Sequence, residues 1–271
     1  MQQKPYSKLY IYEIKGDILD IEGADEKDFI GSWNEEGTSF LFFTHPQDKL
    51  VNKLLEKNKG LKLLSKLDMD YSQWQGGEEL KPIKIPPLVI TPCWEKPELM
   101  LGEKILLLDP SVVFGTGTHP TTVGCLEAII NIYIKEKPKK VLDIGTGTGI
   151  LAIAAAILGA KEVIAVDNNL LAVKTAIKNV KLNHLEKIIK VEAGKGEDFI
   201  NKDADLAILN INKKVIEVIM ASPYFFNKKR YIISGIFISE ADEIIKGLKA
   251  HKIKDIKMTQ KGKWAVINAK R

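Results

Sequence analysis

The second half of the chain alternates between strand-like and helix-like segments, and this alternation limits the folds that the chain can adopt. Beyond Pro138, short runs rich in Val, Ile and Leu alternate with longer segments whose apolar residues recur at helical spacing. Strands that alternate with helices build a parallel sheet covered by helices on both faces. The pattern therefore predicts an α/β fold.

Five strands and four helices are expected in this alternation, followed by two closing strands. The predicted strands are Lys140–Ile144, Glu162–Asp167, Ile188–Ala193, Leu206–Asn210 and Tyr231–Ser234. The predicted helices are Ile150–Leu158, Leu170–Leu182, Lys214–Ala221 and Glu240–Ala250. The closing strands, Lys254–Gln260 and Trp264–Ala269, are joined by so short a turn that they must form an antiparallel pair.

The first 70 residues have a different pattern, which is typical of a small α+β domain. Strands are expected at Leu9–Ile14, Phe29–Trp33, Ser39–Phe43 and Leu61–Leu67, with a helix at Pro46–Lys57. Five prolines between Lys81 and Pro97 predict extended linker or edge-strand backbone, because proline has no N–H to donate. We expect a small domain at residues 1–75, a proline-rich linker at 76–100 and a main domain at 101–271.

Composition excludes several classes of protein. Hydrophobic residues make up 45% of the chain and charged residues 28%, as in soluble globular proteins. No apolar run is long enough to span a bilayer, and Met1–Tyr6 lacks the apolar stretch of a secretory signal. The two cysteines, Cys93 and Cys125, offer neither a disulfide framework nor metal-ligand spacing. We therefore expect a cytoplasmic protein with no metal and no membrane association.

Charge is distributed unevenly along the chain. Residues 1–80 contain 10 lysines against 15 acidic residues, for a net charge of −5, whereas the remainder carries +10. Such a division indicates either a charged partner or simply two solvated surfaces.

A glycine-rich segment follows the first strand of the alternating region and opens a helix. It reads Asp143-Ile144-Gly145-Thr146-Gly147-Thr148-Gly149. Glycine lets the backbone turn sharply and lets a ligand approach where a Cβ would interfere. The next strand ends at Asp167, where a carboxylate can accept hydrogen bonds from both hydroxyls of a ribose. Tight packing at an ordinary strand–helix corner is the alternative for a glycine turn alone.

The glycine spacing separates two classes of nucleoside cofactor. A nicotinamide-dependent dehydrogenase has the fingerprint Gly-x-Gly-x-x-Gly, whereas Ile150 stands here at the position of its third glycine. Asp143, just before the glycines, suits a cationic cofactor better than a pyrophosphate. The residues therefore favour S-adenosylmethionine as cofactor and methyl transfer as reaction, with a dehydrogenase or a non-catalytic binding module as rivals.

These residues resemble the class I S-adenosylmethionine methyltransferases, and within them the ribosomal protein L11 methyltransferases (PrmA type). The resemblance is strongest in Asp109–Thr122, which reads DPSVVFGTGTHPTT. It continues through Asp143–Ala154, Ser234–Ile236 and Gly262–Trp264. It covers roughly the last three-quarters of the chain, and the first 70 residues match only in their pattern of elements.

The resemblance implies a seven-stranded Rossmann-like sheet preceded by a small ferredoxin-like domain that recognises the substrate. The connection from Lys15 to Asp28 leaves little room for the first helix of that domain, which predicts a truncated form. The resemblance also implies a set of cofactor-contacting residues. Asp143 and Gly147, in and next to the glycine loop, are added to the residues that the resemblance implies. The expected set is then Thr122, Asp143, Gly145, Gly147, Asp167 and Asn210.

Three of these residues have expected roles. By resemblance, Asp167 would hold the ribose, Gly145 would supply the backbone turn, and Thr122 would reach in from the upstream loop. Asn210 ends the fourth strand, where it could accept a hydrogen bond from a reacting amine and orient it, cap the next helix, or do both. Asn210 is thus the candidate catalytic residue. We expect His119 to order its loop, because methyl transfer needs an aligned neutral nucleophile more than a strong base.

The sequence therefore predicts a protein methyltransferase that modifies lysine or N-terminal amino groups of a large-subunit ribosomal protein. The substrate comes from the resemblance and from the acidic first part of the chain, which would attract a basic protein. Another protein lysine, RNA or a small molecule is the alternative acceptor. RNA is disfavoured, and no direct nucleic-acid contact is expected, because RNA-binding appendages carry positive charge.

Overall fold

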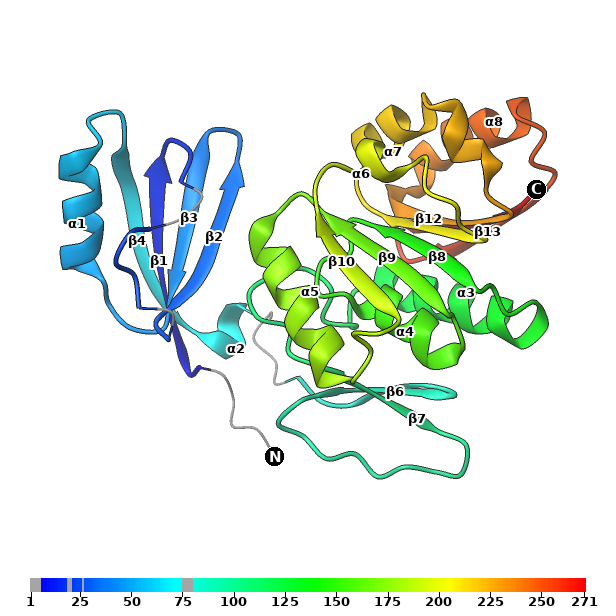
Figure 1. Cartoon of the computed structure of the whole chain (residues 1–271), viewed down its shortest axis with the longest axis horizontal. Helices are drawn as coiled ribbons and strands as arrows, with labels where there is room; N and C mark the ends of the chain where they lie inside the picture. The colour runs from blue at the N-terminus through cyan, green and yellow to red at the C-terminus, as the bar shows by residue number, and fades with distance from the viewer. Residues whose placement is uncertain (1–5, 19–20, 26, 75–79) are drawn as a thin grey trace. The chain divides into compact units, whose positions relative to one another are not determined.

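The computed structural model describes residues 6–18, 21–25, 27–74 and 80–271. They form two compact units, drawn in Figure 1. The first contains the described residues up to Lys81 together with residues 93–95 and 169–171, and the second contains the remainder. The amino-terminal residues 1–5 and the expected boundary at 75–76 lie outside the described residues. The division into recognition domain, linker and catalytic domain stays a prediction.

The first unit is built on a four-stranded antiparallel sheet with the order β2-β3-β1-β4. Its strands are β1 (Lys8–Lys15), β2 (Phe29–Glu35), β3 (Thr38–Phe43) and β4 (Lys62–Asp70). Helix α1 (Asp48–Lys57) contributes Val51 to the hydrophobic cluster that contains Tyr12 and Ile14 of β1, and the short helix α2 (Tyr71–Trp74) follows β4. The strand order and directions are those of the ferredoxin-like fold.

The connection from β1 to β2 contains no helix in its described residues, 16–18, 21–25 and 27–28. Both strands run antiparallel to β3, so they are parallel to each other and this connection crosses over the sheet. Ile18 and Ile21 are buried in the same cluster as Tyr12 and Leu41. The crossover therefore fills the core with two side chains where the full fold has a helix, which matches the predicted truncated form.

The second unit contains a seven-stranded sheet with the order β10-β9-β8-β11-β12-β14-β13, as the resemblance implied. Its strands are β8 (Lys140–Ile144), β9 (Glu162–Asp167), β10 (Ile189–Ala193), β11 (Leu206–Asn210), β12 (Arg230–Phe237), β13 (Asp255–Lys261) and β14 (Trp264–Lys270). The first five are parallel, and β14 is antiparallel to both of its neighbours. The predicted α/β fold with a closing antiparallel pair is confirmed.

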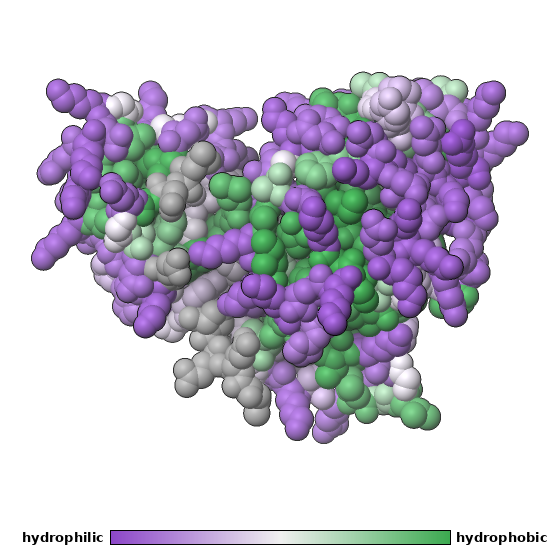
Figure 2. Space-filling view, in the orientation of Figure 1, coloured by the Kyte–Doolittle hydropathy of each residue, from purple (hydrophilic) through white to green (hydrophobic). Residues whose placement is uncertain are grey.

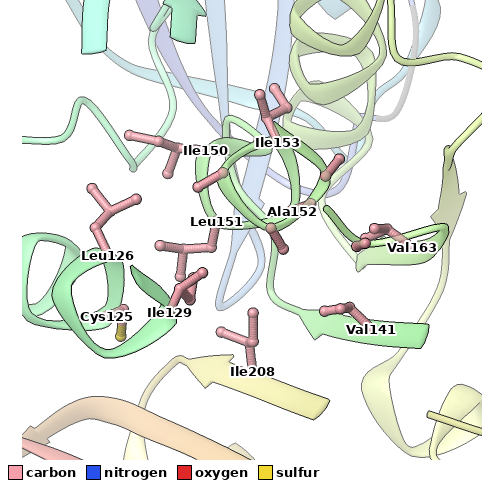
Figure 3. Close-up of a cluster of buried hydrophobic side chains, with 14 of the residues drawn as sticks. Cys125, Leu126, Ile129, Val141, Ile150, Leu151, Ala152, Ile153, Val163 and Ile208 are labelled. Carbon is pink, nitrogen blue, oxygen red and sulfur yellow. The ribbon is translucent and has the colours of Figure 1, made fainter. Parts of the chain in front are cut away.

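Helices cover both faces of this sheet and enclose two hydrophobic clusters. Helices α3 (Pro120–Lys135), α4 (Ile150–Leu158) and α5 (Leu170–Leu182) contribute to one cluster; α7 (Lys213–Met220), the 3-10 helix η1 (Pro223–Asn227) and α8 (Ile238–Ala250) contribute to the other. Figure 3 shows Ile129 of α3 and Leu151 of α4 beside Ile208 of β11. Each fully buried side chain of this size stabilises the fold by about 1.5–3 kcal/mol. Figure 2 shows hydrophilic residues over much of the visible surface of each unit.

Part of the proline-rich segment is folded. It forms β5 (Ile83–Ile85) and β6 (Leu88–Pro92), which pair with β7 (Lys104–Leu108) in a three-stranded sheet. Leu88 and Ile90 of β6 are buried in the hydrophobic cluster to which α3, α4 and α5 contribute. These residues therefore belong to the core of the second unit rather than to an exposed connection.

Helix α3 is absent from the elements that the sequence pattern predicted. Ten of its sixteen residues are buried, and the polar stripe formed by Glu127, Asn131 and Lys135 is too narrow for helical periodicity to stand out. Its start does carry a signal, because Pro120 occupies the first turn and His119 caps the helix by accepting a hydrogen bond from the N–H of Thr121. The short helix α6 (Gly196–Phe199) was not predicted either.

Asn179 of α5 ties three segments of the second unit together. Its side chain is fully buried, and its amide group donates to the carbonyls of Asp109 and Thr148, both at 2.9 Å. Its amide oxygen accepts from the N–H of Asp109 at 2.8 Å.

Replacing Asn179 with Ala should leave these backbone groups buried without partners. We expect the substitution to lower the free energy of unfolding by about 2–4 kcal/mol, measured by urea denaturation. Asn131→Ala removes an exposed asparagine from α3 and should change it by less than about 0.5 kcal/mol. Equal effects of the two substitutions would contradict the role given to Asn179.

Candidate functional site

The carboxyl ends of β8, β9 and β11 meet at one edge of the seven-stranded sheet. Ile144, at the end of β8, pairs with Val166 of β9 on one side and with Leu209 of β11 on the other. Asp167 and Asn210 are the next residues of those two strands, and they flank the glycine-rich loop that follows Ile144. The topology therefore brings the predicted residues of three strands to one place.

The remaining contacts complete the predicted set. Thr122 is fully buried in the first turn of α3, and its hydroxyl oxygen lies 3.5 Å from the side-chain nitrogen of Asn210. It thus comes from a helix rather than from the upstream loop. The N–H of Gly147 donates to a carboxylate oxygen of Asp167 at 2.9 Å. These contacts join Thr122 to Asn210 and Gly147 to Asp167, while Asp143 and Gly145 belong to β8 and to the loop that follows it.

The glycines of the loop are needed for protein packing. Gly145 and Gly147 have positive φ angles of 73° and 56°. A Cβ on Gly147 would lie 2.5 Å from the carbonyl oxygen of Phe114, and one on Gly145 would overlap the side chain of Ile211. Packing against the protein therefore explains these two glycines, whereas the polar groups around them are available to a ligand.

Two buried oxygen atoms at this edge have no hydrogen-bond partner of ordinary geometry among the described residues, although the backbone N–H of Ala152 is close enough to Asp143 to act against the rise of its pKa. They are one carboxylate oxygen of Asp143 and the side-chain oxygen of Asn210. The other oxygen of Asp143 accepts a hydrogen bond from the Thr146 hydroxyl at 2.7 Å. An unpaired buried acceptor costs about 1–3 kcal/mol, so these atoms indicate that a ligand supplies the missing donors.

The carboxyl group of Asp143 is strongly perturbed. Burial raises its pKa to about 7, and the charge of Asp167 acts in the same direction. A cation bound beside Asp143 would favour the ionised form. The Asp143 site therefore fits a positively charged ligand group, as the sequence suggested.

The loop upstream of α3 holds the glycine-rich loop in place. The N–H of Thr148 donates to the carbonyl of Phe114 at 3.1 Å, and the Thr148 hydroxyl donates to the carbonyl of Gly115 at 2.8 Å. Neither contact could be read from the sequence, although both segments belong to the stretches that resemble the family.

Four side chains form an aromatic rim next to this loop. The rings of Phe114 and His119 have centroids 5.1 Å apart, His119 and Trp264 are 5.1 Å apart, and Trp264 stacks on Phe237 at 4.6 Å. Sequence reasoning did not select the three aromatic residues. Phe114 and Trp264 lie inside the quoted family-like stretches, which was the available signal.

Two questions about local roles are answered by hydrogen bonds. Helix α7 is capped by Asn212, whose side chain accepts from the N–H of Val215 at 3.0 Å, so the capping alternative for Asn210 is wrong. His119 caps α3, and its Nδ1 also lies 2.7 Å from the Thr121 hydroxyl. Burial lowers the pKa of His119, and the charge of Lys263 lowers it further.

Other kinds of site find less support in the described residues. No group of three or more His, Cys, Asp or Glu side chains among them is placed to hold a metal ion. Within the same part of the chain, no helix has the length and hydrophobicity required to cross a membrane.

Comparisons with known proteins point to one family. The family model described as ribosomal protein L11 methyltransferase (PrmA) matches residues 25–271. A protein of that name from Alkaliphilus oremlandii is 37% identical over 79% of this chain, and one from Prochlorococcus marinus is 40% identical over 68%. The matched regions cover 69% and 62% of those two relatives. The crystal structure of a ribosomal protein L11 methylase from Lactobacillus delbrueckii superposes with a TM-score of 0.63 at 28% identity, covering 70% of this chain and 98% of that one.

The perturbed carboxyl group of Asp143 predicts how stability depends on pH. Its pKa is raised from 3.8 to about 7 in the folded chain, so the unfolded chain loses the proton first as the pH rises. The free energy of unfolding should therefore fall between about pH 4 and pH 7, by up to roughly 4 kcal/mol, and stay low above that range.

Asp143→Asn removes this titration and should flatten that part of the pH dependence, measured by urea denaturation at about pH 5 and about pH 8. Glu197→Gln, an exposed carboxyl on α6, should leave the dependence as in the wild type. An unchanged slope in Asp143→Asn would show that another group causes it.

Proposed function

The chain belongs to the ribosomal protein L11 methyltransferase (PrmA) family, and we propose that it transfers methyl groups from S-adenosylmethionine to amino groups of ribosomal protein L11. Family membership excludes the nicotinamide-dependent dehydrogenase that glycine spacing already disfavoured. The relatives are longer than the matched region, so acceptor and activity are proposed here for this chain.

The observation that carries the proposal is the pair of unpartnered buried oxygens of Asp143 and Asn210. S-adenosylmethionine supplies an electrophilic methyl group on a sulfonium, and it also carries an ammonium group and a ribose with two hydroxyls. An ammonium beside Asp143 would provide a donor and offset the cost of its buried charge. Asp167 would accept hydrogen bonds from the ribose hydroxyls, and Thr122, Gly145 and Gly147 would line the same site.

Asn210 would act on the acceptor. Its side-chain oxygen can accept a hydrogen bond from an amine N–H, which turns the nitrogen lone pair away from the asparagine and toward the methyl group. Orientation of this kind lowers the barrier without a proton transfer by the protein. Lysine side chains and an N-terminal amino group both have the required chemistry.

The charge of residues 1–80 supports a protein acceptor. A net charge of −5 would attract a basic ribosomal protein and repel RNA, and such a substrate would place the enzyme in the cytoplasm. Another protein lysine is the second candidate acceptor, since the site at the sheet edge recognises only an amine.

A single assay separates these acceptors. The protein is incubated with methyl-labelled S-adenosylmethionine and either purified ribosomal protein L11 or ribosomal RNA, and the label in each is counted. We expect label in L11, located on lysine or the amino terminus by mass spectrometry. Label in RNA alone would overturn the proposed acceptor.

Asp167 and Asn210 should differ in the step that they affect. Asp167→Ala should weaken S-adenosylmethionine binding by about 1–3 kcal/mol in calorimetry, because ribose hydroxyls lose their acceptor. Asn210→Ala should lower kcat by a larger factor than it weakens cofactor binding. If Asn210→Ala weakened binding alone, Asn210 would be a cofactor residue and its role toward the amine would be wrong.

A further inference from the structure

Lys263 places a positive charge against the aromatic rim. It lies in the turn between β13 and β14, and its ammonium nitrogen is 5.2 Å from the ring centroid of Phe237 and 5.5 Å from that of Trp264. Both distances are within the range of cation–π attraction. In the part of the chain that the structure describes, no carboxylate lies within 4 Å of this nitrogen, so its charge is not neutralised by an ion pair.

A chain of contacts connects this ammonium to Asn210. Trp264 touches His119, which caps α3, and Thr122 in the first turn of α3 lies 3.5 Å from Asn210. On the other side, a Cβ on Gly235 of β12 would overlap the backbone of Ile211, the residue that follows Asn210. Lys263 is therefore linked through the aromatic rim and the start of α3 to the residue that is proposed to orient the acceptor amine.

The other charged groups around this part of the site come from several elements. His119 caps α3, Asp143 is the next-to-last residue of β8, and Asp167 ends β9. Glu240 of α8 accepts a hydrogen bond from the N–H of Phe237 at 2.7 Å. Farther along β13, Lys261 is paired with Glu127 of α3, and Lys213 of α7 is paired with Glu217 and Glu243. Neither of these two lysines is an unpaired charge like that of Lys263.

The reaction requires an uncharged amine, and the described side chains at this edge do not supply an evident base. His119 uses Nδ1 to cap α3, so its neutral ring carries the proton on Nε2 and that atom cannot accept another. Asp143 is buried and hydrogen-bonded to Thr146. A free lysine side chain has a pKa of about 10.4, so less than about 0.1% is neutral at pH 7.

We propose that Lys263 promotes methyl transfer by repelling a second cation, so that the acceptor lysine binds beside the aromatic rim as the uncharged amine. The inference rests on the proposed function and names a positioning residue for that reaction. Cationic neighbours activate lysine amines in other enzymes in the same way. The charge of Lys263 also acts, after burial, to lower the pKa of His119 in this rim.

The charge of Lys263 has opposite effects on the rate of methyl transfer, depending on whether the bound amine is protonated or neutral. The neutral amine forms the N–C bond with its lone pair while the S–C bond breaks, its electrons stay on sulfur, and the new ammonium later releases a proton to water. At the transition state the nitrogen carries only part of a positive charge. Lys263 therefore disfavours the ammonium ground state more than the transition state, which raises the rate where the amine is mostly protonated. Where the amine is already neutral, Lys263 lowers the rate.

These opposite effects predict that the curves of kcat against pH for the wild type and for Lys263→Met cross each other. With S-adenosylmethionine and L11 both saturating, kcat reports ionisations in the complex. In Lys263→Met the rise of kcat with pH should move upward by about half a unit, so that the variant is about threefold slower at neutral pH and at least as fast on the alkaline plateau. Lys263→Arg keeps the charge and should retain the wild-type profile. Raising the salt from 0.1 M to 1 M should reduce the difference, because the Debye length falls from about 10 Å to about 3 Å.

A second readout needs neither substrate nor cofactor. The imidazole of His119, followed by NMR in the free protein, should titrate at higher pH in Lys263→Met than in the wild type or in Lys263→Arg. An unchanged His119 titration, or a kcat profile in Lys263→Met that is lowered uniformly without a shift, overturns the inference. Wild-type protein that transfers no methyl to L11 overturns the proposed function instead, so the two failures are distinguishable.

Discussion

The hydrogen bond from the Thr148 N–H to the Phe114 carbonyl joins the two segments on which the site depends. One is the glycine-rich loop after β8 and the other is the loop that leads into α3. Because Gly147 lacks a Cβ, the Phe114 carbonyl can approach the loop closely enough for this bond to form. Asn179 also joins both segments, because its side-chain amide donates hydrogen bonds to the carbonyls of Asp109 and Thr148. The positions of Thr122 and of the aromatic rim follow from this junction, because α3 starts where the upstream loop ends.

The prediction of β8, β9 and β11 succeeded because the sequence pattern that indicates each strand lies within the strand itself. Each is a short apolar run bounded by polar residues, and β8 and β9 end at the residues that the sequence indicated. The parallel alternation then placed Asp167 and Asn210 at the same sheet edge without any structural data. By contrast, α3 is buried on most sides and has few polar positions, and β6 is buried throughout, so an amphipathic pattern is weak in α3 and absent from β6.

The polar details of the site could not be predicted for a different reason. That Asn212 rather than Asn210 caps α7 depends on backbone angles one residue after the strand. The aromatic rim gathers residues from the loop before α3, from the end of β12 and from the start of β14, which are far apart in the sequence. No pattern within a short window reports such contacts. Likewise, the burial of the Asp143 and Asn210 oxygens without partners depends on how the chain packs. It lowers the free energy of unfolding of the ligand-free protein.

Charges of opposite sign lie on the two sides of the proposed site. The carboxylates of Asp143 and Asp167 lie on the side of the glycine-rich loop, whereas the ammonium of Lys263 lies beside the rim. In methyl transfer a positive charge leaves the donor sulfur and appears on the acceptor nitrogen. In the proposed complex, the two carboxylates would lie on the donor side, and the Lys263 cation would oppose the ammonium that forms on the acceptor side. An arrangement of this polarity slows the chemical step for an amine that is already neutral, so it benefits catalysis only if deprotonation of the acceptor limits the rate. The lowered pKa of His119 fits that condition, because a neutral imidazole adds no second cation beside the amine.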